Sequence, residues 1–333
     1  MRIQPRITDF FQNHFAFLCI ASLAAGVVIG SPAGFLAPAN PWLMGVLMFS
    51  SGLGLRVRDL NCLRGRPWLL PVILLLLHVV IPLAWMGIST ALRFPIEAVM
   101  GFTILAIIPI SASCIVWIAL CRGNTTLGMA LILVDSLAAP FIIPSVLSAL
   151  FGADVHMDPL RMLRGLFWML FFPTVLALCC NRISNGGLQR VAGKQFGILA
   201  KFAILTILCI NGGAVSPYFR ELTPLFALMC GMTLCFCALL FLVTFFAGRL
   251  LFARKEDVLA FMLCSVRTTT TGMVIAMAYF PPLTTLAVAF AMLFQQPLGA
   301  WTGKTALRLL EKREIQQEAA THAAQSSQNG CCL

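Results

Sequence analysis

The chain alternates long runs of apolar residues with short polar segments that carry most of the charges. A transmembrane helix needs about 20 consecutive apolar residues. The pattern predicts ten membrane-spanning helices, over residues 13–32, 38–55, 68–92, 96–120, 125–151, 160–181, 197–217, 222–247, 257–279 and 282–302. The first run is long and has no obvious small-residue cleavage site, so we expect it to be a span and not a cleavable signal.

The composition agrees with this pattern. Of the 333 residues, 60% are hydrophobic and 11% are charged, whereas soluble domains have about 45–50% apolar and 25% charged residues. The sequence therefore predicts an all-α polytopic membrane protein with a polar cytoplasmic tail, 304–333, that is disordered. Thirteen cysteines are present, but none has the spacing of a metal site, and nearly all are expected to be small buried hydrophobic residues.

The net charge of +11 follows from the positions of the basic residues and does not indicate a nucleic-acid ligand. If the N-terminus is cytoplasmic, 18 of the 23 Lys and Arg residues fall on the cytoplasmic side and four fall outside. Cytoplasmic loops of membrane proteins carry such an excess. We therefore expect a multi-pass protein of the cytoplasmic (inner) membrane, with both termini cytoplasmic. The sequence does not indicate an oligomeric state.

Two charges lie inside predicted spans, Asp135 and Arg267. Counted from Asn124 and Asp257, each lies about 15 Å into its helix at 1.5 Å per residue. A charge at this depth costs at least ~2.5–3.5 kcal/mol and marks a transport path when it is not merely structural. The similar depths predict that the two side chains form a pair near the midplane. His78, with apolar neighbours, is expected to be a satisfied core residue.

The two halves of the chain share features at an offset of 157 residues. Pro67 matches Pro224, Pro140 matches Pro297, and the hydroxyl residues around Ser111 match those around Thr268. This predicts two five-helix repeats, 1–152 and 160–303. An odd helix number inverts the second copy, which is a plan common in secondary transporters.

Helices 4 and 9 are the expected broken helices of the two repeats. Pro109 interrupts the backbone hydrogen bonding of helix 4, and the segment SVRTTTTG of helix 9 is rich in β-branched residues and hydroxyls. Irregular backbone at membrane depth is tolerated only where protein or water covers it. The candidate substrate-binding residues are Arg267, Asp135, Ser111, Ser113, Cys114, Thr268, Thr269, Thr270, Thr271, Gln295 and Gln296.

Several segments resemble the bile acid–sodium symporter family, within the wider superfamily of bile acid, arsenite and riboflavin transporters. MGVLMFSSGLGLRVRDL is similar to that family's helices 2–3, PISASCIVWIALCRGNTTLGMAL to its helices 4–5, and SVRTTTTGMVIAMAYFPP to its helix 9. Pro109, Arg122–Asn124 and Gly272 are the strongest matches. The resemblance implies ten helices in a panel and a core domain, with helices 4 and 9 crossing where they unwind.

Other positions depart from the family's sodium-site residues. Cys114 and Ile115 stand for a hydroxyl residue and an Asn, Ser265 for a Glu, and Thr269 for a Gln. Hard cations want several oxygen ligands, so the lost carboxylate is the heaviest change. A guanidinium at position 267 could stand where sodium would. We expect degenerate sodium sites, with Ser265 and Asp135 as remaining candidate ion ligands, sodium or a proton as coupling ion, and no other cofactor or metal.

Together these features predict a secondary active transporter of a small organic anion, bound at the midplane between helices 4, 5, 9 and 10. An arsenite-type efflux carrier that uses the Cys114 thiolate stays open, as does a channel or sensor-like membrane protein. The motifs HExxH, GxSxG and Walker A are absent, so we expect no enzymatic activity. The expected partners are the anion and the lipid bilayer, not nucleic acid.

Overall fold

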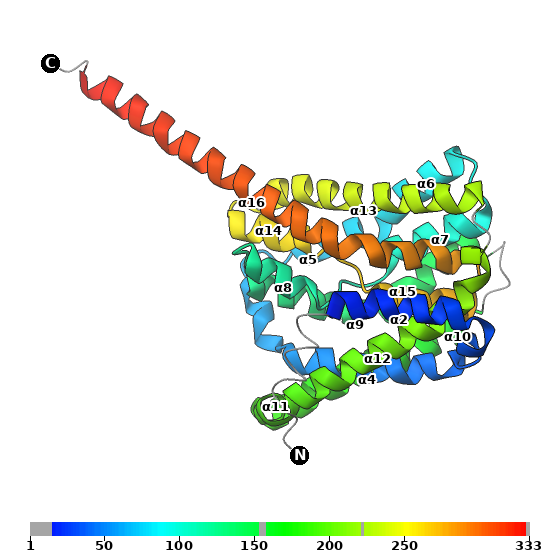
Figure 1. Ribbon diagram of the computed structural model, residues 1–333. Helices are drawn as coiled ribbons and strands as arrows, with labels where there is room; N and C mark the ends of the chain where they lie inside the picture. Colours follow the sequence, from blue (N-terminus) through cyan, green and yellow to red (C-terminus); the bar gives the residue numbers. More distant parts are fainter. Residues whose placement is uncertain (1–14, 153–157, 221–222, 331–333) are drawn as a thin grey trace.

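The computed structural model describes residues 15–152, 158–220 and 223–330 (Figure 1). All regular elements in these residues are helices. They are α2 (Phe15–Ile29), α3 (Ser31–Gly34), η1 (Ala37–Ala39), α4 (Asn40–Gly54), η2 (Val57–Leu63), α5 (Leu69–Leu75), η3 (Leu76–Val80), α6 (Ile81–Ala91), α7 (Ile96–Ile107), α8 (Cys114–Leu120), α9 (Thr125–Phe151), α10 (Pro159–Leu166), η4 (Phe167–Phe171), α11 (Phe172–Ile183), α12 (Gly187–Arg220), α13 (Pro224–Leu251), α14 (Lys255–Leu263), α15 (Thr269–Tyr279) and α16 (Thr284–Gly330).

Five continuous helical stretches in the described residues are long and apolar enough to cross a membrane. They cover Leu69–Ala91, Thr125–Phe151, Pro159–Ile183, Gly187–Phe219 and Pro224–Leu251. Two shorter helices, Phe17–Ile29 and Ile96–Ile107, are also apolar. The chain is therefore an all-α multi-pass membrane protein, as its hydrophobic pattern predicts.

Some helix ends differ from the predicted spans. α12 begins at Gly187 and not at residue 197, because helix continues through the polar segment around Arg190. α16 continues to Gly330, whereas the sequence predicted a disordered tail from residue 304. The Ala, Glu, Gln and Lys residues of this segment are strong helix formers. Figure 1 shows the end of α16 projecting beyond the other helices.

The helices pack in two groups (Figure 1). In the first group, α12 packs against α2 and α4, and α4 packs against α11. In the second group, α16 packs against α7 and α13, and α7 packs against α6. α15 of the second group contacts α4 and α12 of the first. The elements that form the candidate site meet where these two groups face each other.

Glycines let α2 and α12 approach closely. A Cβ atom added at Gly26 would collide with the carbonyl oxygen of Cys209, and one added at Gly212 would collide with the carbonyl oxygen of Leu23. Small residues at such positions are typical of membrane helix pairs, because they let the two backbones come into contact. This contact holds α2 and α12 of the first group together.

Two helices contain a π-helical turn just before a proline. η3 precedes Pro82, and η4 precedes Pro173. Proline has no N–H and its ring clashes with the carbonyl four residues earlier, so the backbone widens at this point. Such π-helical turns are frequent at functional sites. The first of them places His78 in the interior, fully buried.

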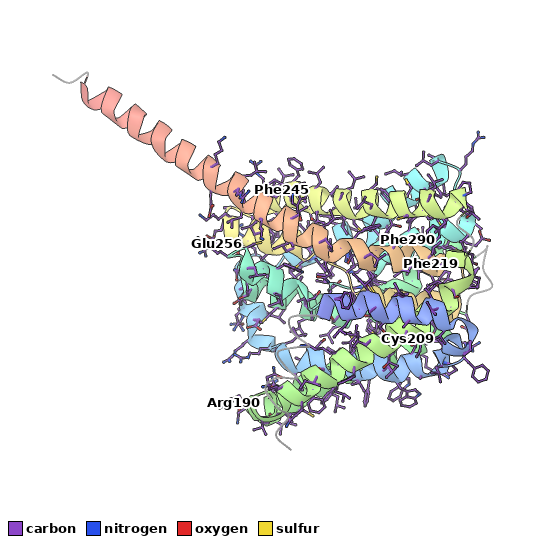
Figure 2. All side chains as sticks on the ribbon, viewed as in Figure 1. Arg190, Cys209, Phe219, Phe245, Glu256 and Phe290 are labelled. Atoms are coloured by element: carbon purple, nitrogen blue, oxygen red, sulfur yellow. The ribbon has the colours of Figure 1, made fainter. Side chains whose placement is uncertain are left out.

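Figure 2 labels residues at both ends of the bundle. Arg190 and Glu256 lie at one end, whereas Phe219 and Phe290 lie toward the other. The rings of these two phenylalanines are 6.0 Å apart, between α12 and α16. Arg190 and the segment before Glu256 belong to the side that the sequence assigns to the cytoplasm, and the sidedness itself stays a prediction.

Candidate functional site

Two interrupted helices meet at the centre of the candidate site. The backbone leaves helical geometry between α7 and α8 and again between α14 and α15. The two connecting segments run antiparallel, with Ile110 opposite Arg267. The N–H of Ser111 donates to the carbonyl of Val266 at 2.8 Å, and the N–H of Thr268 donates to the carbonyl of Pro109 at 2.8 Å. The interruptions thus satisfy each other's main-chain groups at a single crossing.

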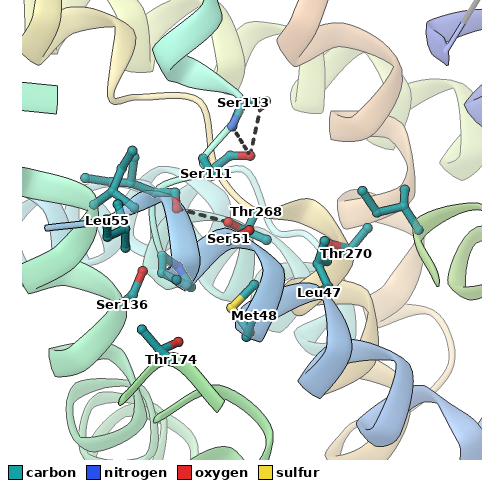
Figure 3. A pocket seen from close by; sticks show the side chains of 16 residues that line it. Leu47, Met48, Ser51, Leu55, Ser111, Ser113, Ser136, Thr174, Thr268 and Thr270 are labelled. Atoms are coloured by element: carbon teal, nitrogen blue, oxygen red, sulfur yellow. Dashed lines mark hydrogen bonds between the residues drawn. The ribbon is translucent and has the colours of Figure 1, made fainter. Parts of the chain in front are cut away.

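A cavity of about 140 Å³ lies beside this crossing (Figure 3). Its wall combines residues of both connecting segments with residues of α4, α9, α11, α12 and α15. The polar side chains of the wall are all hydroxyls: Ser51, Ser111, Ser113, Ser136, Thr174, Thr268 and Thr270. The rest of the wall is apolar, and no charged side chain lines it among the described residues. The cavity can therefore offer hydrogen bonds without a direct ion pair.

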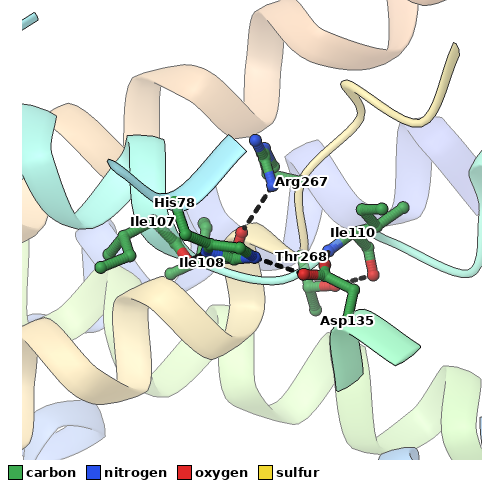
Figure 4. Close-up of polar contacts among 7 residues, drawn as sticks. All are labelled: His78, Ile107, Ile108, Ile110, Asp135, Arg267 and Thr268. Atoms are coloured by element: carbon green, nitrogen blue, oxygen red, sulfur yellow. Dashed lines mark hydrogen bonds and ion pairs between the residues drawn. The ribbon is translucent and has the colours of Figure 1, made fainter. Parts of the chain in front are cut away.

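Asp135 is the centre of a buried polar cluster behind the crossing (Figure 4). Its carboxylate accepts a hydrogen bond from the N–H of Ile110 at 2.5 Å. The other carboxylate oxygen pairs with Nε2 of His78. His78 Nδ1 lies 3.0 Å from the carbonyl oxygen of Ile107 and donates to it. The cluster therefore holds together three elements: η3, α9, and α7 with the segment that follows it.

Arg267 is buried without an ion pair among the described residues. Its side chain is 1% exposed, and Nη1 donates to the carbonyl of Ile108 at 3.2 Å. Nε and Nη2 have no hydrogen-bond partner. Because α7 ends here, its last carbonyls lack helical partners, and cations at a helix C-terminus are favourable. His78 and Arg267 therefore occupy the carbonyl end of α7 together.

The predicted pair of Asp135 with Arg267 was wrong, because Asp135 instead contacts His78. Similar depths along two helices do not determine which side chains lie nearest in space. The expectation that His78 is a satisfied buried residue agrees with its two hydrogen bonds.

Two glutamines connect α16 to the crossing. The Oε1 atom of Gln295 accepts a hydrogen bond from the N–H of Arg267 at 2.9 Å. The Nε2 atom of Gln296 donates to Ser113 at 3.1 Å, and its Oε1 accepts from the indole N–H of Trp117 at 2.7 Å. These contacts hold the connecting segments against α16. Of the residues that make them, only Ser113 lines the cavity.

The structure divides the predicted site residues into two sets. Ser111, Ser113, Thr268 and Thr270 line the cavity. The others surround the crossing without lining it: Asp135, Cys114, Arg267, Thr269, Thr271, Gln295, Gln296 and Ser265. Of these, Ser265 bonds Thr244 at 2.5 Å, and Cys114 is fully buried. Among the described residues no group of three or more His, Cys, Asp or Glu side chains could hold a metal ion.

Sequence reasoning missed four polar residues of the site. Ser51, Ser136 and Thr174 line the cavity, and His78 binds the carboxylate of Asp135. A single Ser or Thr in an apolar helix looks the same in sequence whether its hydroxyl lines a cavity or bonds the backbone of its own helix. Ser136 could have been found, because it directly follows a charge within a span.

The turn after α8 anchors this half of the site. Arg122 adopts a left-handed conformation with φ of 56°. The Asn124 side chain caps α9 by accepting from the N–H groups of Thr126 and Leu127, and it donates to Asp257 at 2.8 Å. Asp257 lies in the first turn of α14. The turn therefore holds the ends of the two interrupted helices in register.

Comparison with known proteins matches this chain to the SBF-like CPA transporter family over residues 9–298. The chain belongs to this family. The match spans both interrupted helices and the crossing, and the resemblance to the bile acid–sodium symporters is thereby confirmed. The protein is a membrane transporter.

Its relatives are distant in sequence. The chain is 28% identical over 285 residues to the protein YbaS of Bacillus subtilis (strain 168), covering 85% of this chain and 93% of that one. It is 21% identical over 301 residues to YocS of the same organism, named a sodium-dependent transporter, covering 90% and 92%. It is 25% identical over 199 residues to BASS1 of Oryza sativa subsp. japonica, a probable chloroplastic sodium/metabolite cotransporter, covering 59% and 48%.

Proposed function

We propose that this transporter is a secondary active carrier that binds a small organic anion in the cavity at the crossing. The observation that carries the proposal is the hydroxyl-lined cavity beside two interrupted helices. Substrates of secondary transporters bind where interrupted helices meet. The cavity of about 140 Å³ is smaller than the roughly 300–1,000 Å³ of pockets for drug-sized ligands, which favours a substrate of few heavy atoms.

The charge behind the cavity favours an anion. Arg267 carries two nitrogens without partners although it is buried, so its positive charge is incompletely compensated. An anion among the hydroxyls of Thr268 and Thr270 would lie near this charge and near the N-terminal end of α15, where negative groups are stabilised. A bound anion would therefore relieve the cost of the buried guanidinium.

The proposal includes a membrane topology for the chain. Ten spans in two inverted repeats, 1–152 and 160–303, would place the interruptions of helices 4 and 9 at related positions. The antiparallel contact between Ile110 and Arg267 is the arrangement expected of two such symmetry-related breaks. Both termini would lie in the cytoplasm, in the cytoplasmic membrane.

Of the properties named for the relatives, sodium coupling has the least support in the contacts of this chain. YocS and BASS1 carry sodium in their names. In this chain the guanidinium of Arg267 bonds the carbonyl of Ile108 at the end of α7. The Ser265 hydroxyl bonds Thr244. A fixed cation thus occupies a main-chain carbonyl beside the crossing, which supports degenerate sodium sites.

The alternative of arsenite efflux has less support. Cys114 would be its thiolate ligand, but this side chain is fully buried and does not line the cavity. The alternative of a channel or sensor-like membrane protein has no specific contact in its favour.

A ligand screen tests the proposal. Purified full-length protein is heated with small mono- and dicarboxylic acids, neutral analogues and arsenite, and the unfolding midpoint is recorded. We expect carboxylates to raise the midpoint and their neutral amides not to. Thr268→Val should weaken the shift, whereas Thr233→Val, a buried hydroxyl on α13, should not. Stabilisation by the amides or by arsenite alone would contradict the anion proposal.

A further inference from the structure

We propose that His78 and Asp135 form a proton-binding site whose proton favours binding of the transported anion. This inference rests on the proposed anion transport and names its coupling ion. The two side chains are 0% and 1% exposed and contact each other directly behind the crossing.

The hydrogen bonds of His78 fix its protons. A carbonyl oxygen can only accept, so Nδ1, which faces the carbonyl of Ile107 at 3.0 Å, carries a proton. Nε2 faces a carboxylate oxygen of Asp135. One more proton lies between these two atoms, because two lone pairs would otherwise face each other. The pair then holds one exchangeable proton, as imidazolium with carboxylate or as imidazole with carboxylic acid, and is neutral in both forms.

Loss of this proton changes the charge of the cluster. With the proton bound, the neutral pair and Arg267 together carry a charge of +1. Without it, the Asp135 carboxylate balances the guanidinium. Net charge is costly at membrane depth, so an anion gains more by binding the protonated state. Because this linkage is reciprocal, a bound anion raises the affinity of the pair for its proton by the same factor.

Few other ionisable groups act on the pair. Among the described residues, Arg267 interacts electrostatically with Asp135, and so does the thiol of Cys114, which itself neighbours that of Cys264. A second cavity of about 10 Å³ borders Asp135, and its other lining residues, from α5, η3, α9 and Ile110, are apolar. The shared proton is therefore the one whose loss alters the charge at the crossing.

The pair is connected to the substrate cavity through the main chain. Asp135 accepts the N–H of Ile110, and the carbonyl of Ile110 accepts the hydroxyl of Thr268 at 3.1 Å. Ile110, Thr268 and the next residue of α9, Ser136, all line the cavity. A change in charge on the carboxylate therefore acts on the cavity wall.

In one transport cycle, one proton and one monovalent anion would bind from one side of the membrane and leave to the other, moving no net charge.

The first test observes the proton directly. The chain has four histidines, and replacing His14, His156 and His322 by Gln leaves His78 alone. Nitrogen NMR of ¹⁵N-histidine in the purified full-length protein then reports both ring nitrogens. We expect Nδ1 to stay protonated across the pH series, while the Nε2 signal changes when the shared proton is lost. In Asp135→Asn the amide donates to Nε2, and the titration should disappear. A pH-independent spectrum, or a titration unchanged by Asp135→Asn, would overturn the site.

The second test measures coupling. Proteoliposomes in sodium-free potassium buffer, with valinomycin to clamp the voltage, receive radiolabelled pyruvate or benzoate with and without an inward proton gradient. We expect the gradient to drive several-fold accumulation in the wild type. Asp135→Asn imitates the protonated acid, so exchange across the membrane should persist while accumulation falls to the equilibrium level. Thr233→Val should behave as the wild type.

The two tests separate this inference from the proposed function. Uptake that ignores the proton gradient, together with an invariant His78 signal, would overturn proton coupling and leave anion transport standing. A titrating His78 signal without uptake of any of the acids would support the proton site and count against organic anion transport.

Discussion

The carboxylate of Asp135 accepts the N–H of Ile110 at 2.5 Å, across the gap between α9 and the segment that follows α7. Ile110 lies opposite Arg267 at the crossing and lines the cavity. A buried acid on a continuous helix is therefore bonded to the unwound backbone that lines the cavity. The stability of this connection and its role in transport can be measured separately.

The pair of His78 and Asp135 should dominate a double-mutant cycle. Removing one partner of a buried charged pair typically costs about 3–5 kcal/mol. His78→Ala and Asp135→Ala should each lower stability by an amount of this order, and the double mutant should lose clearly less than the sum. Unfolding in detergent measures all four proteins.

The cycle of Arg267→Ala with Asp135→Ala provides the comparison. These two side chains are not ion-paired in the structure, so their interaction energy should be smaller than that of Asp135 with His78. The reverse order would mean that Arg267, and not His78, contacts the acid.

Transport should not require sodium. Arg267 already donates to the Ile108 carbonyl, so replacing sodium by potassium or choline in proteoliposomes should leave the initial uptake rate unchanged. Arg267→Gln should remove most uptake at every sodium concentration, because the positive charge is lost. A steep sodium dependence of the wild type would show that backbone carbonyls complete a sodium site.

The Asn124 side chain should stabilise the junction between α9 and α14. Asn124→Ala removes a helix cap and the bond to Asp257, and loss of a cap alone costs about 0.5–2 kcal/mol. We expect a lower unfolding midpoint in detergent. Thr126→Ala, at an exposed position of the same helix turn, is the matched control. Equal effects of the two substitutions would contradict this role.

Close packing of α2 against α12 should make Gly26 intolerant of substitution. In Gly26→Ala the new methyl group meets the carbonyl of Cys209, so α2 must move away from α12 and stability falls. Gly231→Ala, where the methyl group meets no atom within 4 Å, should be neutral or stabilising by up to about 1 kcal/mol. Thermal unfolding of both variants measures the difference, and similar midpoints would exclude the close contact.

Reporter fusions test the predicted topology. The excess of Lys and Arg on one side predicts a cytoplasmic signal from a reporter fused after residue 333. A reporter inserted within 153–159 should give the opposite signal. Signals from the same side would refute ten spans with both termini cytoplasmic.

Much of the fold was predictable because its cause is local. Apolar runs gave the spanning helices, and Pro109 and the threonine run indicated the two interruptions. Ser111, Ser113, Thr268 and Thr270 followed from the same argument and line the cavity. These residues are near the breaks in sequence, so their place needed no knowledge of packing.

The partner of Asp135 was not predictable in this way. Three segments of the chain bring His78, Asp135 and Arg267 close together, and only their orientation and spacing decide which pair makes contact. The π-helical turn before Pro82 sets the direction of the His78 side chain. A single proline in an apolar run does not predict such a turn. The pairing with Arg267 failed for this reason, because depth fixes one coordinate of three.

The crossing is held by hydrogen bonds between main-chain atoms, Ser111 N to Val266 O and Thr268 N to Pro109 O. Such bonds do not depend on which side chains the two segments carry. Replacing the hydroxyls at 111, 113, 268 and 270 should therefore alter what the cavity accepts while the frame survives. Libraries confined to these four positions offer a direct route to carriers with new cargo on an unchanged scaffold.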